Sequence, residues 1–333
     1  MLLAWRRKSL SSSKIRFGIV GLGAIGAEVL KYMLERGHTL VFAVDSDKNK
    51  AGKYIDQIFG TGPRILISSE PNTDNLNNAE LAIICTSSRL RSIYQLVHFF
   101  SSAGVDVVST CEELAYPWLS EPEISEELNK LAIQNKSRIV GAGVNPGFIM
   151  DLLPSVVALA SKRPKKIHVT RSVDVSRRRS QLRSKLGIGM SKGSVERGLK
   201  EGTLGHVGLR ESICIIAYSM GMEVKNLSYN YELITGSDNY VIGVRQFSEG
   251  DAGECRLRLD LEMSLTSADF DLIEVEGEPR LKVRFEGGVF GDTATVAMVA
   301  NISERIKHAR PGLITVLDVP LAKAPQTNAF RSS

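Results

Sequence analysis

The sequence predicts an α/β protein in which a doubly wound parallel sheet is followed by an α+β part with a mostly antiparallel sheet. Short apolar runs alternate with helical patterns from residue 15 to residue 142, which is typical of parallel strands joined by covering helices. From residue 255 to residue 265, apolar and polar residues alternate without exception, as in an antiparallel strand with one buried face. The length of 333 residues is sufficient for two such domains.

The first strand is the compact apolar run at residues 15–19. The glycine-rich turn after it opens a helix that ends near Gly37, a natural C-cap. In chain order we then expect a strand at 40–44, a helix at 50–59, strands at 64–67 and 81–86, a helix at 90–102, a strand at 106–110, a helix at 123–135 and a strand at 138–142.

The pattern changes after the Asn-Pro-Gly segment at residues 145–147. A helix from residue 151 and a strand at 167–173 precede a polar and basic loop. Later we expect helices near 194–200 and 207–220, alternating strands through 229–233, 255–265 and 281–285, a last helix at 293–306 and an extended tail with Pro311, Pro320 and Pro325. Long alternating strands mixed with helices are typical of an α+β domain.

Charge and composition exclude several classes of protein. The net charge is +5, but four basic residues lie among the first fourteen, which contain no acid, so the remainder carries only +1. A nucleic-acid-binding protein needs a basic face rather than a basic tail, so nucleic acid is disfavoured as a partner. No apolar run approaches the ~20 residues of a membrane-spanning helix. The four cysteines form no Cys-x-x-Cys pair, which argues against a cysteine zinc site, and neither this nor a disulfide framework is expected, which fits the reducing cytoplasm; we expect no metal.

The turn Gly21-Leu-Gly23-Ala-Ile-Gly26 has the context of a dinucleotide-binding Rossmann motif. It follows a strand, opens a helix, and is followed by Asp45, an acid that ends the next strand 19 residues beyond Gly26. Gly21 would permit the tight turn, Gly23 the approach of a pyrophosphate, and Gly26 the close packing of helix on strand. Asp45 would accept hydrogen bonds from the adenosine ribose and so favours NAD(H), whereas three nearby lysines, Lys48, Lys50 and Lys53, would suit NADP(H).

Other cofactor contacts are expected where parallel strands end, because ligands bind beyond their carboxyl ends. Three such ends carry hydroxyls or bare backbone, at 86–88, 109–111 and 141–143. The expected cofactor-binding residues are Gly21, Gly23, Ala24, Ile25, Gly26, Asp45, Thr86, Ser87, Ser88, Thr110, Cys111 and Asn145.

Two adjacent acids, Glu112 and Glu113, follow the fifth strand at the expected nicotinamide end. Neighbouring side chains point in different directions, so at most one is expected to face the pocket, and the other to be a solvated acid at a helix start. The one in the pocket could act as a general base or hold a substrate ammonium. The basic segment 177–179 is either a solvated surface or a clamp for a carboxylate.

Several longer motifs together resemble the 2,4-diaminopentanoate dehydrogenase family, which includes native amine dehydrogenases. The resemblance extends from about residue 14 to about residue 320. Its motifs are Thr110-Cys111-Glu112-Glu113-x-Ala115-Tyr116-Pro117, Gly143-Val-Asn145-Pro146-Gly147-Phe148-Ile-Met150-Asp151, Asp174-x-Ser176-x-Arg178-Arg179, Gly205-His206-Val207-Gly208-Leu209-x-Glu211-Ser212 and Gly291-Asp292-Thr293-Ala294-Thr295.

This resemblance implies the architecture of dihydrodipicolinate reductase and assembly as a homodimer. After a disordered basic leader at 1–13, residues 14–147 would form the Rossmann domain. Residues 148–292 would form an α+β domain for substrate binding and dimerisation, and residues 293–333 would pack back on the Rossmann domain.

The implied activity is the oxidative deamination of an amine similar to 2,4-diaminopentanoate, giving a ketone and ammonia, with reductive amination as its reverse. NAD(H) or NADP(H) would be the cofactor. The family's catalytic acid falls on Glu112 or Glu113, and we favour Glu112 because it directly follows the strand end. The substrate-binding residues that the resemblance implies are Asn145, Pro146, Phe148, Met150, Arg178, Arg179 and His206.

Two alternatives remain open at this point. One is reduction of an imine or carbonyl without ammonia, as in dihydrodipicolinate reductase, but none of the five histidines is adjacent to another, so the paired-histidine motif of that enzyme is missing. The other is a non-catalytic protein that senses a dinucleotide or binds nucleic acid through its basic leader and residues 177–179.

Overall fold

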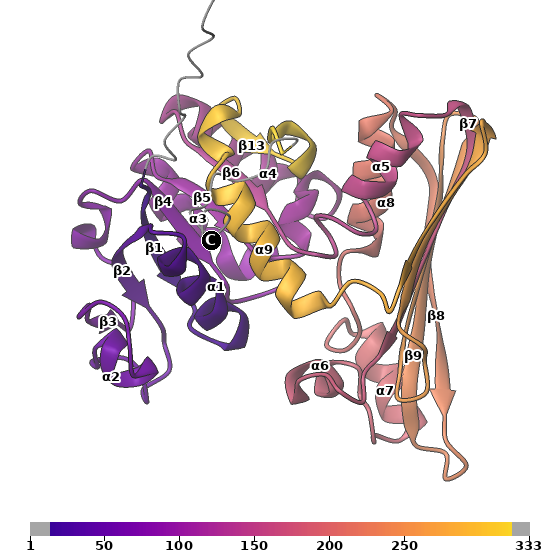
Figure 1. The fold of residues 1–333 in the computed structure, drawn as a ribbon, viewed down its shortest axis with the longest axis horizontal. Helices are drawn as coiled ribbons and strands as arrows, with labels where there is room; N and C mark the ends of the chain where they lie inside the picture. The colour runs from indigo at the N-terminus through magenta and orange to yellow at the C-terminus, as the bar shows by residue number, and fades with distance from the viewer. Residues whose placement is uncertain (1–13, 322–333) are drawn as a thin grey trace, which may run out of the picture.

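The computed structural model describes residues 14–321. The leader predicted for residues 1–13 lies outside the described residues, as do residues 322–333. Within the described range the chain forms two sheets, which stand apart in Figure 1 with helices between and around them.

The first sheet has seven strands, and each neighbouring pair in it is parallel. Its order is β13-β6-β5-β4-β1-β2-β3, which confirms the predicted doubly wound Rossmann sheet. The central strands are continuous apolar runs because both of their faces are covered, as the almost complete burial of β4 shows. The strands are β1 (Arg16–Val20), β2 (Thr39–Val44), β3 (Ile67–Ser68), β4 (Leu81–Ile84), β5 (Asp106–Ser109), β6 (Arg138–Gly141) and β13 (Gly312–Ile314).

Helices cover both faces of this parallel sheet. On one face α1 (Ala24–Glu35) packs beside α9 (Gly291–Ser303), and on the other α3 (Leu90–Ser102) packs beside α4 (Pro122–Gln134). Figure 1 shows α9, in yellow, lying next to α1 although it comes from the far end of the chain. A buried carboxylate ties the two segments together, because Glu304 accepts hydrogen bonds from Arg36 at 2.6 Å and pairs with His38 at 2.9 Å.

Three expectations for this half were wrong in detail. The predicted helix at 50–59 is only α2 (Ile55–Phe59), because the amides of Lys50 and Ala51 bond back to the Asp47 carbonyl in successive turns. The predicted strand at 64–67 is shorter and shifted, since β3 pairs only with the last two residues of β2. The supposedly extended tail contributes β13, which pairs in parallel with β6 and completes the sheet.

The second sheet has six strands in the order β12-β11-β7-β10-β9-β8. Only β7 and β10 pair in parallel, which confirms the mostly antiparallel sheet. The alternation at 255–265 corresponds to β10, whose apolar side chains are all nearly inaccessible. The strands are β7 (Lys162–Asp174), β8 (Val224–Thr235), β9 (Val241–Ala252), β10 (Cys255–Ser264), β11 (Phe270–Glu278) and β12 (Leu281–Glu286).

Helices lie on the inner face of this mixed sheet, toward the parallel sheet. The face is covered by α5 (Leu152–Ala158) and α8 (Leu209–Ser219) (Figure 1). Two further helices, α6 (Ser180–Lys185) and α7 (Lys192–Lys200), lie near one end of it. The expected basic loop therefore contains α6, which was missed because five of its six residues are polar and give no apolar period.

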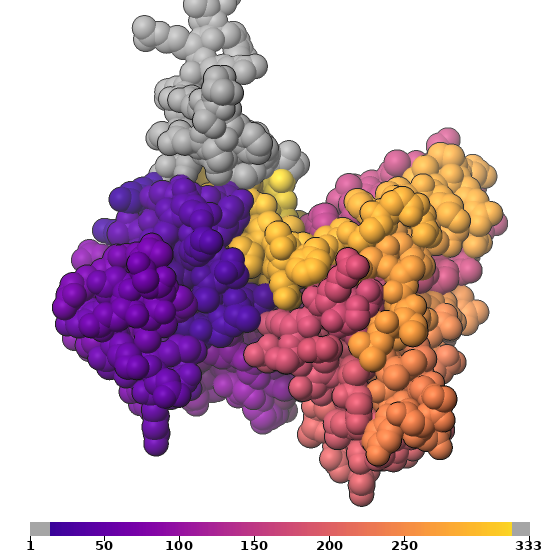
Figure 2. All heavy atoms as spheres, turned by 60° about the horizontal axis from the view of Figure 1, so that its bottom comes forward, coloured from indigo at the N-terminus to yellow at the C-terminus, as the bar shows by residue number. Residues whose placement is uncertain are grey.

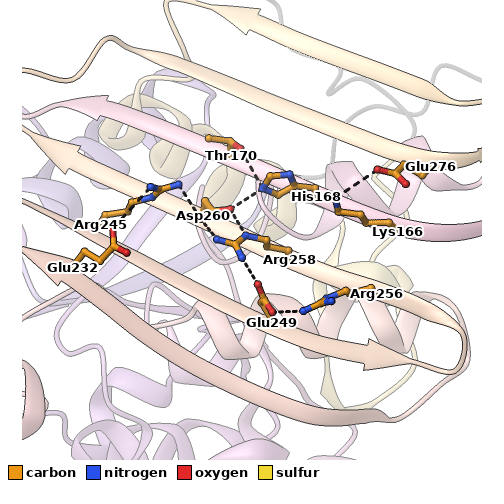
Figure 3. Close-up of polar contacts among 10 residues, drawn as sticks. All are labelled: Lys166, His168, Thr170, Glu232, Arg245, Glu249, Arg256, Arg258, Asp260 and Glu276. Carbon is orange, nitrogen blue, oxygen red and sulfur yellow. Dashed lines mark hydrogen bonds and ion pairs between the residues drawn. The ribbon is translucent and has the colours of Figure 1, made fainter.

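The outer face of the mixed sheet carries charged side chains that pair with one another, as Figure 3 shows. At its centre, Asp260 accepts hydrogen bonds from His168 and Arg258, both at 2.7 Å. Burial alone would raise the pKa of Asp260, but these two partners outweigh it and hold that pKa well below its usual range. Arg258 also pairs with Glu249, which links Arg256 to the same cluster. Among residues 14–321, no helix has the length and hydropathy required to cross a membrane.

Candidate active site

The glycine turn between β1 and α1 has the packing that a dinucleotide site requires. A Cβ at Gly26 would lie 1.9 Å from the Gly21 carbonyl oxygen, so helix and strand can approach only because residue 26 is glycine. Gly21 has φ +90°, a conformation that other residues rarely adopt. Gly23 has no atom within 4 Å of its Cβ position, and no side chain caps the amides that open α1. The turn thus presents open space in front of free N–H groups, where a pyrophosphate fits.

Asp45 lies at the end of β2 with its carboxylate held against this turn. It accepts hydrogen bonds from the Leu22 amide at 2.7 Å, the Asp47 amide at 2.8 Å and the Lys50 ammonium at 3.0 Å. Burial tends to raise the pKa of Asp45, yet these donors outweigh it and lower the pKa. An ionised acid and a lysine therefore stand side by side where an adenosine ribose would lie.

Two adjoining cavities lie beyond the carboxyl ends of the parallel strands, on the side facing the mixed sheet. The first, about 220 Å³, is lined by the ends of β4, β5 and β6. The second, about 210 Å³, extends toward β7 and β10. Figure 2 shows the two halves of the molecule as separate lobes with an indentation between them. The residues that line both cavities are Glu112, Val144, Asn145, Arg179, Lys185 and Thr295.

The structure brings together most of the residues expected around a nicotinamide. Six of them line the first cavity, and Lys185 donates a hydrogen bond to one of them, Ser88, at 3.1 Å. Ser87 also accepts a bond from the Arg89 amide just before α3, so it supports the helix start as well. The six residues are Thr86, Ser87, Ser88, Thr110, Cys111 and Asn145.

The adjacent acids Glu112 and Glu113 face different surroundings. Glu112 lines both cavities. Glu113 points the other way and is buried, where it pairs with Arg89 at 2.5 Å and accepts the Leu90 amide at 2.8 Å. If Glu113 did not face the pocket, we expected it to be solvated, and that expectation was wrong. Its carboxylate accepts the first amide of α3, a helix that has no capping hydrogen bond from its own N-cap side chain.

Lys185 is a cavity residue that the sequence reasoning missed. It ends α6, and its ammonium lies 3.1 Å from a Glu112 carboxylate oxygen. Burial favours a raised pKa for Glu112, but the charge of Lys185, with a smaller contribution from the hydrogen bond of Ser88, lowers it instead. Thr295 was missed as well, although it belongs to the motif at 291–295; its hydroxyl accepts the Val144 amide at 3.2 Å.

His206 forms one wall of the second cavity. Gln246 holds its backbone in place by accepting its N–H and donating to its carbonyl. Burial, assisted by the charge of Lys185, lowers the pKa of His206 to about 4, so the ring is neutral near pH 7. Its Nε2 and the Asn145 side-chain oxygen are both buried and have no hydrogen-bond partner among residues 14–321. Both atoms are free to bind a small polar molecule.

The segment that carries Asn145 is fastened by a buried acid, Asp151. Its carboxylate accepts the Gly147 amide at 2.8 Å, the Leu152 amide at 2.6 Å and the Ser212 hydroxyl at 2.7 Å. Since Ser212 belongs to α8, this carboxylate joins the loop after β6 to the helix of the mixed sheet.

The remaining expected substrate contacts divide between cavity and core. Pro146 lines the first cavity, and Arg178 and Arg179 line the second, where Arg178 stacks on Phe290 at 3.7 Å. Phe148 and Met150, which were also expected to contact the substrate, line neither of these two cavities. Both pack into the apolar core under the mixed sheet, because the chain turns inward there before α5.

A doubly wound sheet, a glycine turn fit for a pyrophosphate and a polar cavity at the strand ends define a dinucleotide-dependent oxidoreductase. The family model for the 2,4-diaminopentanoate dehydrogenase C-terminal domain matches residues 148–256 and 261–332, more than half of the chain. The chain belongs to this family. Membership overturns the non-catalytic alternative, because the family consists of dehydrogenases.

Individual relatives agree with this assignment. The 2,4-diaminopentanoate dehydrogenase of Acetoanaerobium sticklandii is 28% identical over 335 residues, covering 93% of this chain and 95% of the relative. Among solved structures, an amine dehydrogenase from Mycobacterium smegmatis matches with a TM-score of 0.84 at 20% identity, covering 94% of this chain and 98% of its own. A dehydrogenase from Clostridium difficile matches at 0.55 with 12% identity, covering 88% and 90%. These structures share the fold.

Proposed function

We propose that this protein is an NAD(P)-dependent amine dehydrogenase that converts an amine similar to 2,4-diaminopentanoate to a ketone and ammonia, and catalyses the reverse reductive amination. One observation carries the proposal: a single ionised acid, Glu112, lies where the two cavities adjoin. The names of the relatives support the reaction class, since one acts on 2,4-diaminopentanoate and another is an amine dehydrogenase.

The nicotinamide cofactor would be held by the glycine turn through its pyrophosphate and by Asp45 through its ribose. Asn145, Thr110 and residues 86–88 would contact the nicotinamide end in the first cavity. A bound nicotinamide would supply the hydride acceptor for the carbon that bears the amine. Asp45 favours NAD(H), whereas Lys50, 3.0 Å from it, could pair with the 2′-phosphate of NADP(H), so both cofactors remain within the proposal.

The proposed proton transfers use Glu112. Loss of the hydride and of one amine proton leaves an imine, and a water then adds to the imine carbon. Glu112 would take one proton of that water at a carboxylate oxygen and give it to the imine nitrogen, which leaves a carbinolamine. It would then take the hydroxyl proton and give it to the same nitrogen, so that the C–N bond breaks, ammonia leaves and the C=O bond forms. A general base contributes about 10²–10⁴-fold to such a rate. The neutral His206 ring and Arg179 would contact the substrate, with Arg179 suited to a carboxylate.

The discriminating experiment is the oxidation of NADH or NADPH in the presence of a 4-oxo amino acid, with and without ammonia. We expect turnover only when ammonia is present. Turnover that ignores ammonia would instead select the alternative, an imine or carbonyl reductase. No turnover with ammonia and any ketone offered would overturn the proposed reaction.

Two further parts of the proposal concern the state of the protein in the cell. All four cysteines are free thiols, which supports a location in the reducing cytoplasm. Assembly as a homodimer stays a prediction, and the mass in solution, compared with the 36.4 kDa of the chain, would test it.

A further inference from the structure

Lys185 connects the two halves of the molecule at the cavity. It belongs to α6 of the mixed-sheet half, but its ammonium donates to Glu112 and Ser88, which follow β5 and β4 of the parallel sheet. Both bonds are 3.1 Å long, and the lysine side chain is about one-third exposed. Lys185 lines both cavities, so any molecule bound beside Glu112 also lies beside this ammonium.

This position has a consequence for a substrate that is itself an amine. A primary amine carries a positive charge near pH 7, and hydride loss requires the neutral form, because the nitrogen lone pair must form the C=N bond. A second ammonium placed at Glu112 would be repelled by Lys185 at close range, whereas a neutral amine would not.

We propose that Lys185 is a positioning residue that keeps Glu112 an oriented carboxylate and disfavours the protonated form of the substrate, so that the amine binds as its free base. The inference rests on the proposed function and extends it to the protonation state of the substrate. Lys185 takes no part in bond breaking, because its effect passes through Glu112 and through charge.

The other charged and titratable groups around Glu112 do not provide this effect. His206 faces it with a neutral ring, and the Cys111 thiol beside it is buried, with its pKa raised out of range. Around the second cavity, Arg171 is neutralised by Asp271 at 2.6 Å. Arg179 pairs with Asp292 at 3.5 Å, and Arg178 stacks on Phe290. Lys185 is therefore the cation in direct contact with the Glu112 carboxylate within residues 14–321.

The first test is the pH profile of kcat for deamination, at saturating amine, in Lys185→Met and Lys185→Arg, because kcat/KM would also report the ionisation of the free amine. An opposite charge at this distance lowers the pKa of a carboxyl by about 1–3 units, so the acidic limb of Lys185→Met should move up by that amount. Lys185→Arg keeps the charge and should restore the wild-type limb. Lys192→Met, an exposed lysine on the adjacent α7 that pairs with Glu196, is the matched control and should leave the profile unchanged.

The inference is wrong if the acidic limb of Lys185→Met does not move. It is also wrong if the limb of Lys185→Arg moves as far as that of Lys185→Met. A second measurement does not depend on turnover: the titration of Glu112 followed by NMR in protein carrying ¹³C-labelled glutamate carboxyls, with Glu112→Gln to assign the signal. Lys185→Met should raise the Glu112 pKa, and an unchanged value would contradict the positioning role. If the titration shifts while the wild-type protein shows no ammonia-dependent turnover, the proposed function fails and the contact between Lys185 and Glu112 stands.

Discussion

Two adjacent acids show how a difference of one position in the chain changes the surroundings of a side chain. Glu112 and Glu113 have the same side chain, yet Glu112 lines the cavities and Glu113 pairs with Arg89 under α3. The short 3₁₀ turn at Glu113–Ala115 directs the two side chains apart. Sequence reasoning could predict that at most one of the two acids would face the pocket. It could not predict which one, because that depends on the tertiary contact between Glu113 and the first residue of α3.

Exchanging these two acids for amides should separate catalysis from stability. Glu112→Gln should reduce deamination by about 10²–10⁴-fold with little change in thermal stability, because it removes the proposed base from a cavity. Glu113→Gln should do the reverse and lower the free energy of unfolding by about 1.5–3 kcal/mol, since it removes a charged hydrogen-bond partner of a helix start. Steady-state kinetics and urea unfolding of both variants check this. Full activity in Glu112→Gln would remove it as the base.

The neutral, half-buried histidine His206 predicts a specific pH dependence of stability. The pKa of His206 is about 4 in the folded protein and 6.5 in an exposed histidine, so below pH 6.5 the unfolded chain binds a proton that the folded chain does not. The stability that His206 contributes is therefore complete above pH 6.5 and is lost as the pH falls from 6.5 to 4. His206→Gln should show a smaller fall in urea midpoint over this range than the wild type. Equal falls in both proteins would contradict the lowered pKa.

At the scale of elements, the loop after β6 depends on one buried carboxylate. Asp151 caps α5 and also holds Gly147 and Ser212, so it fixes the loop that carries Asn145 against α8. A carboxylate suits this position because both of its oxygens accept, whereas an amide offers only one accepting oxygen.

Asp151→Asn should therefore destabilise the protein although its shape is preserved. The amide would turn an N–H toward either the Gly147 or the Leu152 amide, leaving a buried donor unpaired at a cost of about 1–3 kcal/mol. Ser212→Ala removes one bond to the same carboxylate and should cost less, about 0.5–1.5 kcal/mol. Urea unfolding measures both. A larger loss in Ser212→Ala than in Asp151→Asn would show that the carboxylate does not organise this loop.

At the scale of the whole molecule, the chain returns to its starting domain to complete both the sheet and the site. β13 pairs with β6, and α9 lies beside α1 and places Thr295 in both cavities (Figure 1). Glu304 holds this C-terminal segment against the first domain by pairing with Arg36 and His38, and all three side chains are at most 10% exposed.

Breaking this buried pair should affect stability and activity together. Glu304→Gln leaves the Arg36 guanidinium buried without a counter-charge, and such a loss typically costs about 3–5 kcal/mol. Because α9 also carries Thr295, we expect weaker binding of NADH as well. Thermal unfolding and NADH fluorescence titration measure the two effects. Lys130→Met removes an exposed ion pair with Glu126 and should change neither, which makes it a suitable control.

Much of the fold could be read from local patterns. The helix expected at 90–102 is α3 (Leu90–Ser102), and the alternating segment from 255 is β10, because in both the burial of one face imposes a period on neighbouring residues. The glycine turn and Asp45 were also found from spacing, since that geometry is confined to one strand–turn–helix unit. Periodicity and short spacings are properties of contiguous chain, so composition and order alone were sufficient to predict the fold class and the strand–turn–helix unit that carries the glycines.

Local patterns could not predict the contacts between segments that are far apart in the sequence. Lys185 is 73 residues from Glu112 in the chain, α6 has too few apolar residues to show a period, and β13 is three residues long. Contacts of this kind form only once the helices and strands between them have packed, since the free energy of packing sets their positions. Which of Glu112 and Glu113 lines the cavities, the charge beside Glu112 and the seventh strand were therefore decided by the three-dimensional arrangement.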